Sequence, residues 1–223
     1  MKLDHPNISK CYRIAKSSSE VWILLEYADG GSLESLILTY GKLPENLVAN
    51  YLTQIIHGLV YLHEKKVIHR DIKPSNILMT SQGQVKISDF GCSQQMLTSQ
   101  TPLQLVTQMK GSVPYMAPEA LRQEVLSRKA DIWSLGCLAL ELATGKDPWA
   151  HKQWDNLFSA MLYIGKRNVT PPICDSLSSG MKEFLGKCFQ RDLKKRASAK
   201  TLLGDPWLCK HGMGDENRFK DPS

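Results

Sequence analysis

The chain has 223 residues, of which 42% are hydrophobic and 22% are charged. These proportions are ordinary for a globular protein that buries its own core, and they exclude a chain that is disordered throughout. The formal net charge is +6, which favours anionic ligands in general. No dense block of lysine and arginine is present, so we do not expect nucleic acid as a partner.

The six cysteines show neither a Cys-x-x-Cys spacing nor a zinc-type Cys/His pattern. Free thiols are typical of a reducing compartment. The opening residues lack the apolar region of a secretory signal, and the longest apolar run, 132–143, is too short and too interrupted to cross a bilayer. We therefore expect a cytoplasmic protein without a membrane partner.

The first predicted element is a buried strand over residues 21–27, and no strand-rich segment is expected before it. Residues 29–31 end this strand, and Ser32 is the expected N-cap of a short helix. Pro44 then opens a long helix. Its apolar residues recur at helical spacing and predict a stripe that faces the core: Val48, Tyr51, Leu52, Ile55, Leu59 and Leu62.

Two short strands follow at 77–80 and 85–88, and the Gly-containing segment between them predicts a hairpin. Residues 92–116 are polar and rich in turn residues, which predicts a loop. The most apolar helix begins at Ser127 or Arg128 and ends at Gly145, and we expect it to be buried on nearly all sides.

Three further helical stretches are predicted near residues 154–163, 178–190 and 198–203. The chain after Trp207 is polar, and we expect it to fray. Mostly helical composition is therefore expected beyond the predicted hairpin.

The predicted hairpin brings polar side chains together. Asn76 lies just before its first strand and Asp89 just after its second, so both belong to the same open end. A carboxylate and an amide oxygen suit a hard cation such as Mg²⁺. Asp71 and Lys73 precede Asn76 in the same loop, so a base and a cation lie close to the metal ligands. These are the parts needed for phosphoryl transfer.

Three motifs follow one another along the chain: His69-Arg-Asp-Ile-Lys-Pro-Ser-Asn76, Asp89-Phe-Gly91 and Ala117-Pro-Glu119. In this order they resemble the signature set of eukaryotic serine/threonine protein kinases. The resemblance covers about residues 5–208. It implies an α+β, protein-kinase-like fold that consists mostly of the helical C-terminal lobe, with two strands of an incomplete N-terminal lobe and the hinge.

The same resemblance implies a division of the chain. A partial kinase domain is expected over residues 1–208, followed by a polar tail over 209–223. Within the domain, residues 1–28 would be the remnant of the N-terminal lobe with the hinge, and residues 29–208 would be the C-terminal lobe.

ATP and Mg²⁺ are the cofactors that the resemblance implies. Asp71 resembles the catalytic base, and Lys73 resembles the cation that contacts the transferred phosphoryl group. Asn76 and Asp89 resemble the metal ligands. The remaining implied contacts with the nucleotide are made by the gatekeeper, the hinge, the catalytic loop and the floor under the base: Leu25, Glu26, Ala28, Ser75 and Leu78.

Regulatory residues are also implied. Arg70 would receive a phosphate from the activation loop. Thr107 is the first candidate for that phosphorylation site, and Ser112 competes with it, as do Thr98, Ser99 and Thr101. Solvent exposure alone would equally explain these hydroxyls.

Three structural residues complete the set implied by the resemblance. Glu119 and Arg196 would form a buried ion pair. Asp131 would hold the backbone of the catalytic loop from the N-terminus of the most apolar helix.

Residues 109–119 and 142–149 look like MAP kinase kinase kinases of the STE group, so the implied substrate is a MAP kinase kinase. Val113-Pro114 departs from the usual pattern of that group, and Pro74-Ser75 also suits MAP kinase kinases. The position in the cascade is therefore left open.

The sequence contains no Gly-x-Gly-x-x-Gly loop and no Val-Ala-Ile-Lys-like strand, which the family uses to hold the ATP phosphates. We therefore expect this chain alone to be weakly active or inactive, as a fragment, a splice form or a truncated gene model would be. The alternative function is a binding or regulatory module. A small-molecule phosphotransferase is disfavoured by Ala117-Pro-Glu119.

Overall fold

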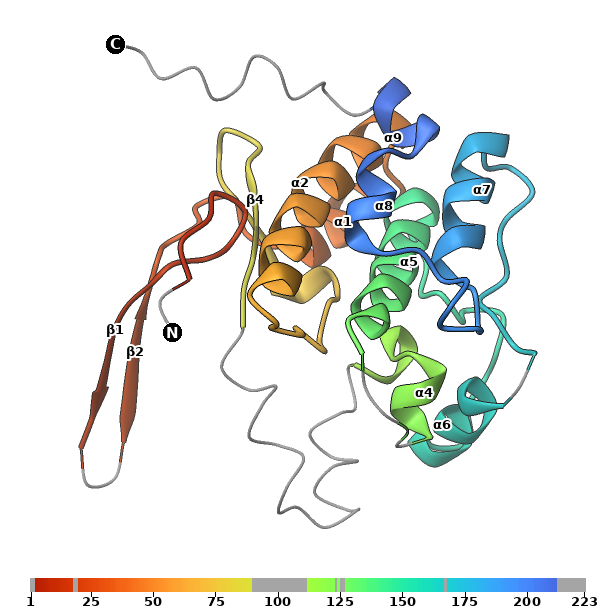
Figure 1. Cartoon of the computed structure of the whole chain (residues 1–223), viewed down its shortest axis with the longest axis horizontal. Coiled ribbons are helices and arrows are strands. Elements are labelled where there is room, and N and C mark those ends of the chain that lie inside the picture. The colour runs from red at the N-terminus through yellow and green to blue at the C-terminus, as the bar shows by residue number, and fades with distance from the viewer. Residues whose placement is uncertain are drawn as a thin grey trace.

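The computed structural model describes residues 3–17, 20–89, 112–122, 124, 127–166 and 168–211. Within them, two separate antiparallel hairpins accompany a body of helices (Figure 1). The elements in chain order, with η for 3₁₀ helices, are β1 (Cys11–Lys16), β2 (Val21–Leu25), α1 (Leu33–Tyr40), α2 (Glu45–Glu64), η1 (Pro74–Asn76), β3 (Ile77–Met79), β4 (Val85–Ile87), η2 (Val113–Tyr115), α4 (Pro118–Leu121), α5 (Lys129–Thr144), α6 (Leu157–Gly165), α7 (Ser179–Cys188), α8 (Ala199–Leu203) and α9 (Pro206–His211). No described helix is both long and apolar enough to cross a membrane.

Helix α5 lies at the centre of the helical body, and nearly all of its side chains are buried. It packs against α2 and α7. Gly136 permits the close approach of α7, because an added Cβ would lie 2.7 Å from Cβ of Cys188. Gly145 ends the helix in the left-handed conformation, at φ 68°. The predicted central helix is therefore confirmed.

Helices α1 and α2 also form as the sequence indicates. Ser32 caps α1 by accepting a hydrogen bond from the backbone N–H of Ser35, and Pro44 is the N-cap of α2. The predicted stripe of α2 faces the core, with all six of its residues buried: Val48, Tyr51, Leu52, Ile55, Leu59 and Leu62.

The first hairpin differs from the sequence prediction in two ways. A strand, β1, precedes residue 21, and β2 is exposed along its whole length rather than buried. Trp22 is 65% exposed, for example. Figure 1 shows the reason: this hairpin projects away from the helical body, so no described element covers either of its faces.

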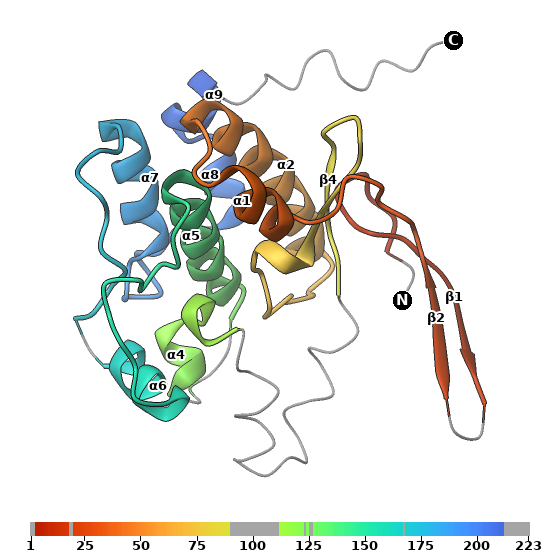
Figure 2. The same cartoon turned by 180° about the vertical axis from the view of Figure 1, so that it is seen from behind.

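The second hairpin forms as predicted, with strands one residue shorter. Gly83 occupies its turn at φ 76°. Residues 7–9 lie along β4, because Ile87 donates its N–H to the carbonyl of Asn7 at 2.9 Å and accepts one from Ser9 at 2.8 Å. The hairpin packs on α2, and Figure 2 shows both from the opposite side.

The C-terminal helices require smaller corrections. Residues 208–211 do not fray, since α9 continues to His211 and Leu208 is buried. Trp207 packs on Phe184 of α7, and this contact holds the last helix to the body. Helix α6 begins at Leu157 rather than near residue 154, and Asn156 is its N-cap.

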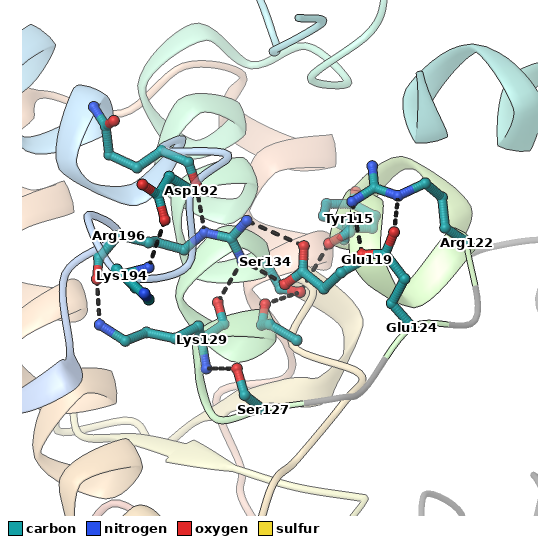
Figure 3. A network of polar contacts seen from close by, with 12 residues as sticks. Tyr115, Glu119, Arg122, Glu124, Ser127, Lys129, Ser134, Asp192, Lys194 and Arg196 are labelled. Atoms are coloured by element: carbon teal, nitrogen blue, oxygen red, sulfur yellow. Dashed lines mark hydrogen bonds and ion pairs between the residues drawn. The ribbon is translucent and has the colours of Figure 1, made fainter. Parts of the chain in front are cut away.

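A buried ion pair joins α4 to the segment between α7 and α8 (Figure 3). The guanidinium of Arg196 donates to both carboxylate oxygens of Glu119, at 2.6 and 3.1 Å, and both residues are 1% exposed. Arg196 also donates to the carbonyls of Lys129 and Gln190, and its guanidinium lies 5.1 Å from the ring centre of Trp133. The guanidinium of Arg196 thus has hydrogen-bond acceptors on both α4 and α5.

We predict that Glu119→Ala lowers the free energy of unfolding by about 3–5 kcal/mol, because it leaves the Arg196 cation buried without its counter-ion. Urea denaturation followed by circular dichroism measures the change. Glu124→Ala is the matched control. Its pair with Arg122, also visible in Figure 3, is partly exposed, so the loss should be below about 1 kcal/mol. Equal losses in the two variants would contradict the prediction.

Candidate active site

The loop over residues 69–76 connects the end of α2 to β3, and one carboxylate of α5 holds it. Asp131 is fully buried in the first turn of α5. Its Oδ2 accepts the backbone N–H of His69 at 3.0 Å, and its Oδ1 accepts that of Arg70 at 2.8 Å. Nε2 of His63 lies 2.8 Å from Oδ2, so this nitrogen carries a proton.

The ring of His69 fixes the other side of the loop. Its Nδ1 accepts the backbone N–H of Asp71 at 3.3 Å, so Nε2 carries the proton and donates to the carbonyl of Ser88 at 2.9 Å. His69 is fully buried. The loop is thereby tied both to α5 and to the segment that leaves β4.

Asp71, Lys73 and Asn76 are in direct contact. Oδ2 of Asp71 forms an ion pair with Nζ of Lys73 at 2.9 Å and accepts a hydrogen bond from Nδ2 of Asn76 at 2.7 Å. Nδ2 of Asn76 also donates to the backbone carbonyl of Asp71 at 2.8 Å. Oδ1 of Asp71 accepts no hydrogen bond from a described residue and remains available to a proton donor.

Asn76 and Asp89 lie at the same end of the second hairpin. Ile77 pairs with Ile87 across the strands, and Ser88 donates its N–H to the carbonyl of Asn76 at 2.8 Å. Asp89 is exposed and has φ 64°. Among the described residues, no donor occupies either Oδ1 of Asn76 or the carboxylate of Asp89.

These two oxygen groups fit a magnesium ion. The described residues contain no cluster of three or more His, Cys, Asp and Glu side chains that could hold a metal by themselves. Asn76 and Asp89 would supply two oxygen ligands to a cation at this end of the hairpin. Mg²⁺ suits such a site, because it commonly retains waters and phosphate oxygens beside one or two protein ligands.

Ser112 departs from the sequence expectation. Its hydroxyl is not an exposed candidate for phosphorylation: the residue is 7% exposed, and its Oγ accepts a hydrogen bond from Nζ of Lys73 at 2.7 Å. Ser112 is the N-cap of η2, which turns the chain back towards the loop. Thr98, Ser99, Thr101 and Thr107 lie outside the described residues.

The segment that begins with η2 is anchored to α5. The Tyr115 hydroxyl donates to the Glu141 carboxylate at 2.5 Å, and Ser134 donates to the carbonyl of Tyr115 at 2.8 Å. Burial raises the pKa of Glu141, and the neighbouring carboxylates of Asp147 and Glu34 raise it further. Burial and the Glu141 carboxylate likewise raise the pKa of Tyr115, so its hydroxyl remains a donor.

The expected nucleotide-binding residues near the hinge are more open. Leu25 is 46% exposed at the end of β2, and Ala28 is half-buried. Residues 30–32 run along β3, since Met79 donates to the carbonyl of Gly31 and Ser32 bridges to Leu78. Leu78 is thus beside the segment that follows the hinge.

An ion pair holds the side chain of Glu26 in place. Its carboxylate pairs at 3.0 Å with the ammonium of Lys86 on β4, and Lys86 is buried. Lys86 also donates to the carbonyl of Pro6 at 2.9 Å. This ion pair connects the base of the first hairpin to the second.

The remaining predicted residues surround this centre. Arg70 is half-buried at φ 72°, next to the backbone that Asp131 holds, and Ser75 is half-buried in η1. Glu119 and Arg196 pair at a distance from the loop, as described above. Sequence reasoning did not single out Ser88 and Lys86, because each acts through contacts between segments that are far apart in the chain.

We predict that Asp131→Asn disturbs the loop, because an amide replaces one acceptor by a donor and leaves at least one of three N–H groups unsatisfied. The free energy of unfolding should fall by about 1–3 kcal/mol, and amide hydrogen exchange at His69 and Arg70 should accelerate. Asp175→Asn, at an exposed position, is the control and should change neither. Unaltered amide hydrogen exchange at His69 and Arg70 in Asp131→Asn would contradict the prediction that the Asp131 carboxylate holds the loop.

Comparison with known proteins places the chain in a family. Residues 1–208 match the protein kinase domain. The chain is 42% identical over 96% of its length to cytokinesis protein sepH of Aspergillus terreus. It is 40% identical over 98% of its length to mitogen-activated protein kinase kinase kinase 2 of Arabidopsis thaliana, and 41% identical over 94% to serine/threonine-protein kinase STE11 of Saccharomyces cerevisiae. It spans only 15%, 33% and 29% of these relatives, respectively. The chain therefore belongs to the protein kinase family and is similar to its MAP kinase kinase kinases.

Proposed function

We propose that the chain is the catalytic part of a protein serine/threonine kinase, which transfers the γ-phosphate of ATP to a protein hydroxyl. The observation that carries this proposal is the contact of a carboxylate, an ammonium and an amide, those of Asp71, Lys73 and Asn76, within one loop. The family match and the STE11 relative support it.

Asp71 would act on the substrate hydroxyl. As the hydroxyl oxygen bonds to the γ-phosphorus and the bond to the ADP oxygen breaks, its proton would pass to the carboxylate, where Oδ1 is available. Lys73 lies 2.9 Å from Oδ2 and would neutralise charge on the transferred phosphoryl group. The buried Asp131 would keep both residues in place through the backbone of the loop.

Asn76 and Asp89 would hold Mg²⁺ between the loop and the phosphates. When bound, the ion would neutralise phosphate charge. The hinge backbone at Glu26 and Ala28 would contact adenine, with Leu78 as the floor under the base and Leu25 as the gatekeeper, and Ser75 would contribute to nucleotide binding. Arg70 would receive a phosphate from residues 90–111, where Thr107 is the first candidate.

The cellular setting is proposed from the relatives. One relative is named a mitogen-activated protein kinase kinase kinase and is 40% identical, and another is named a serine/threonine-protein kinase and is 41% identical. From these relatives we infer a MAP kinase kinase as the substrate. The five described cysteines are free thiols, which supports a cytoplasmic location. Residues 1–208 would be the kinase domain, with the hinge near residue 28.

The test is phosphate transfer from radiolabelled ATP to a MAP kinase kinase whose own activity has been abolished. We expect Asp71→Asn to reduce incorporation by roughly 100-fold or more, and Asp89→Asn to raise the Mg²⁺ concentration that half-maximal activity requires. The absolute rate of the chain should be low, because the hinge hairpin is exposed on both faces.

Asp175→Asn serves again as the control, since it removes an exposed carboxylate outside the site and should leave the rate unchanged. Incorporation that does not depend on Asp71 would sink the proposal. A complete absence of transfer, with no thermal shift on adding ATP and Mg²⁺, would instead favour the alternative of a binding module.

A further inference from the structure

A groove separate from the candidate active site opens where the link between α1 and α2 meets the end of α5. Leu43 donates its N–H to the carbonyl of Leu142 at 2.8 Å, and Gly145 packs directly on Lys42. Segments 146–151 and 172–177 form the other walls. The groove has a volume of about 830 Å³, which is in the range of pockets that enclose a ligand.

The floor of this groove is apolar. Leu43, Leu140 and Leu177 line it and are each less than 10% exposed, and prolines at 44, 148 and 172 add rigid apolar surface. A large apolar side chain placed there would leave water without requiring the groove to reorganise.

The rim of the groove carries charged side chains that can form ion pairs with a bound partner. Lys42 and Lys146 are exposed and form no ion pair with a described residue. Asp147 uses one carboxylate oxygen to accept the N–H of Trp149 at 2.7 Å, and no described donor occupies the other. The groove therefore suits a segment with an apolar anchor, acidic residues on one side of it and a donor or cation on the other.

The second acidic residue at the groove, Glu45, already accepts hydrogen bonds, and its partners show which segments lie nearby. Its carboxylate accepts the indole N–H of Trp207 at 3.1 Å, and it also accepts the backbone N–H of Ser178 at 2.8 Å. Trp207 belongs to α9, and the ring of His211, the last described residue, lies 6.2 Å from the ring of Trp207. The chain after His211 thus starts beside one end of the groove.

Residues 212–223 carry the required chemistry in the required order. Asp215 and Glu216 come first, and Phe219 follows, flanked by Arg218 and Lys220. The eight residues from 212 to 219 span at most about 26–29 Å when extended, which is enough to cross a groove of this size. We propose that residues 212–223 of this chain dock in the groove, with Phe219 on the apolar floor and Asp215 and Glu216 against Lys42 and Lys146.

A peptide fits better than other classes of partner. A nucleic acid would bring phosphates towards Asp147 and has no side chain for the floor. The site is also concave, whereas a lipid surface needs a protruding apolar face. The proposal does not depend on the catalytic function, because no residue of the 69–76 loop lines the groove.

Cys174 provides the measurement, because it lines the groove and its thiol is exposed. The rate of alkylation by N-ethylmaleimide is followed by peptide mass spectrometry on the full chain, with the exposed Cys11 on β1 as the internal reference. We expect Phe219→Ser to raise the rate at Cys174 about threefold or more relative to Cys11, as the docked population falls.

Charge exchange makes the test specific. Lys42→Glu should raise the rate at Cys174, and adding Asp215→Lys and Glu216→Lys should restore protection. Lys194→Glu, at an exposed position outside the groove, is the matched control and should have no effect. Lys42 and Lys194 are both exposed, so the fold should be retained.

Three outcomes would overturn the proposal. Rates unaffected by Phe219→Ser would exclude the tail as the occupant. Failure of the charge exchange to restore protection would show that the variants act without direct pairing. Protection that disappears on dilution would assign the groove to the tail of a second copy rather than to the same chain.

Discussion

The Asp131 carboxylate is fully buried, and it holds the loop over residues 69–76 by accepting hydrogen bonds from two consecutive backbone N–H groups and from Nε2 of His63. A buried carboxylate is costly unless its oxygens are satisfied, and here three donors satisfy them. Because α5 is itself enclosed by α2 and α7, the position of the loop is set by the core. The geometry of Asp71, Lys73 and Asn76 thus follows from the packing of helices rather than from the loop alone.

A second tie makes this arrangement resistant to local change. The ring of His69 bonds both to Asp71 in its own loop and to Ser88 beyond β4, while Ser88 bonds to Asn76. The candidate base Asp71 and the candidate metal ligand Asn76 are therefore linked through His69 and Ser88, and Asp89 directly follows Ser88 in the chain. Preorganisation of this kind is what phosphoryl transfer requires, since charge must be neutralised without rearranging the site.

The sequence predicted those parts of the molecule whose pattern is local. The stripe of α2, the cap at Ser32 and the hairpin that follows Asn76 depend on residues close in the chain. It failed for β2, because an apolar run indicates a buried strand only if another layer covers it, and no described element does. It also missed Ser112, whose burial depends on Lys73, nearly forty residues earlier, and no spacing rule connects such residues.

The two halves of the candidate active site consequently differ in physical support. Asp71, Asn76 and Asp89 lie on a loop and a hairpin that are held by the buried helices α5 and α2. Leu25 instead lies on a two-stranded hairpin, a structure of marginal stability when it is exposed on both faces. The Glu26–Lys86 ion pair, the backbone bonds along residues 7–9 and those of residues 30–31 with Met79 tie that hairpin to the body. The affinity for the adenine half of ATP should therefore depend on whatever covers β1 and β2, while the geometry of the phosphate half should not.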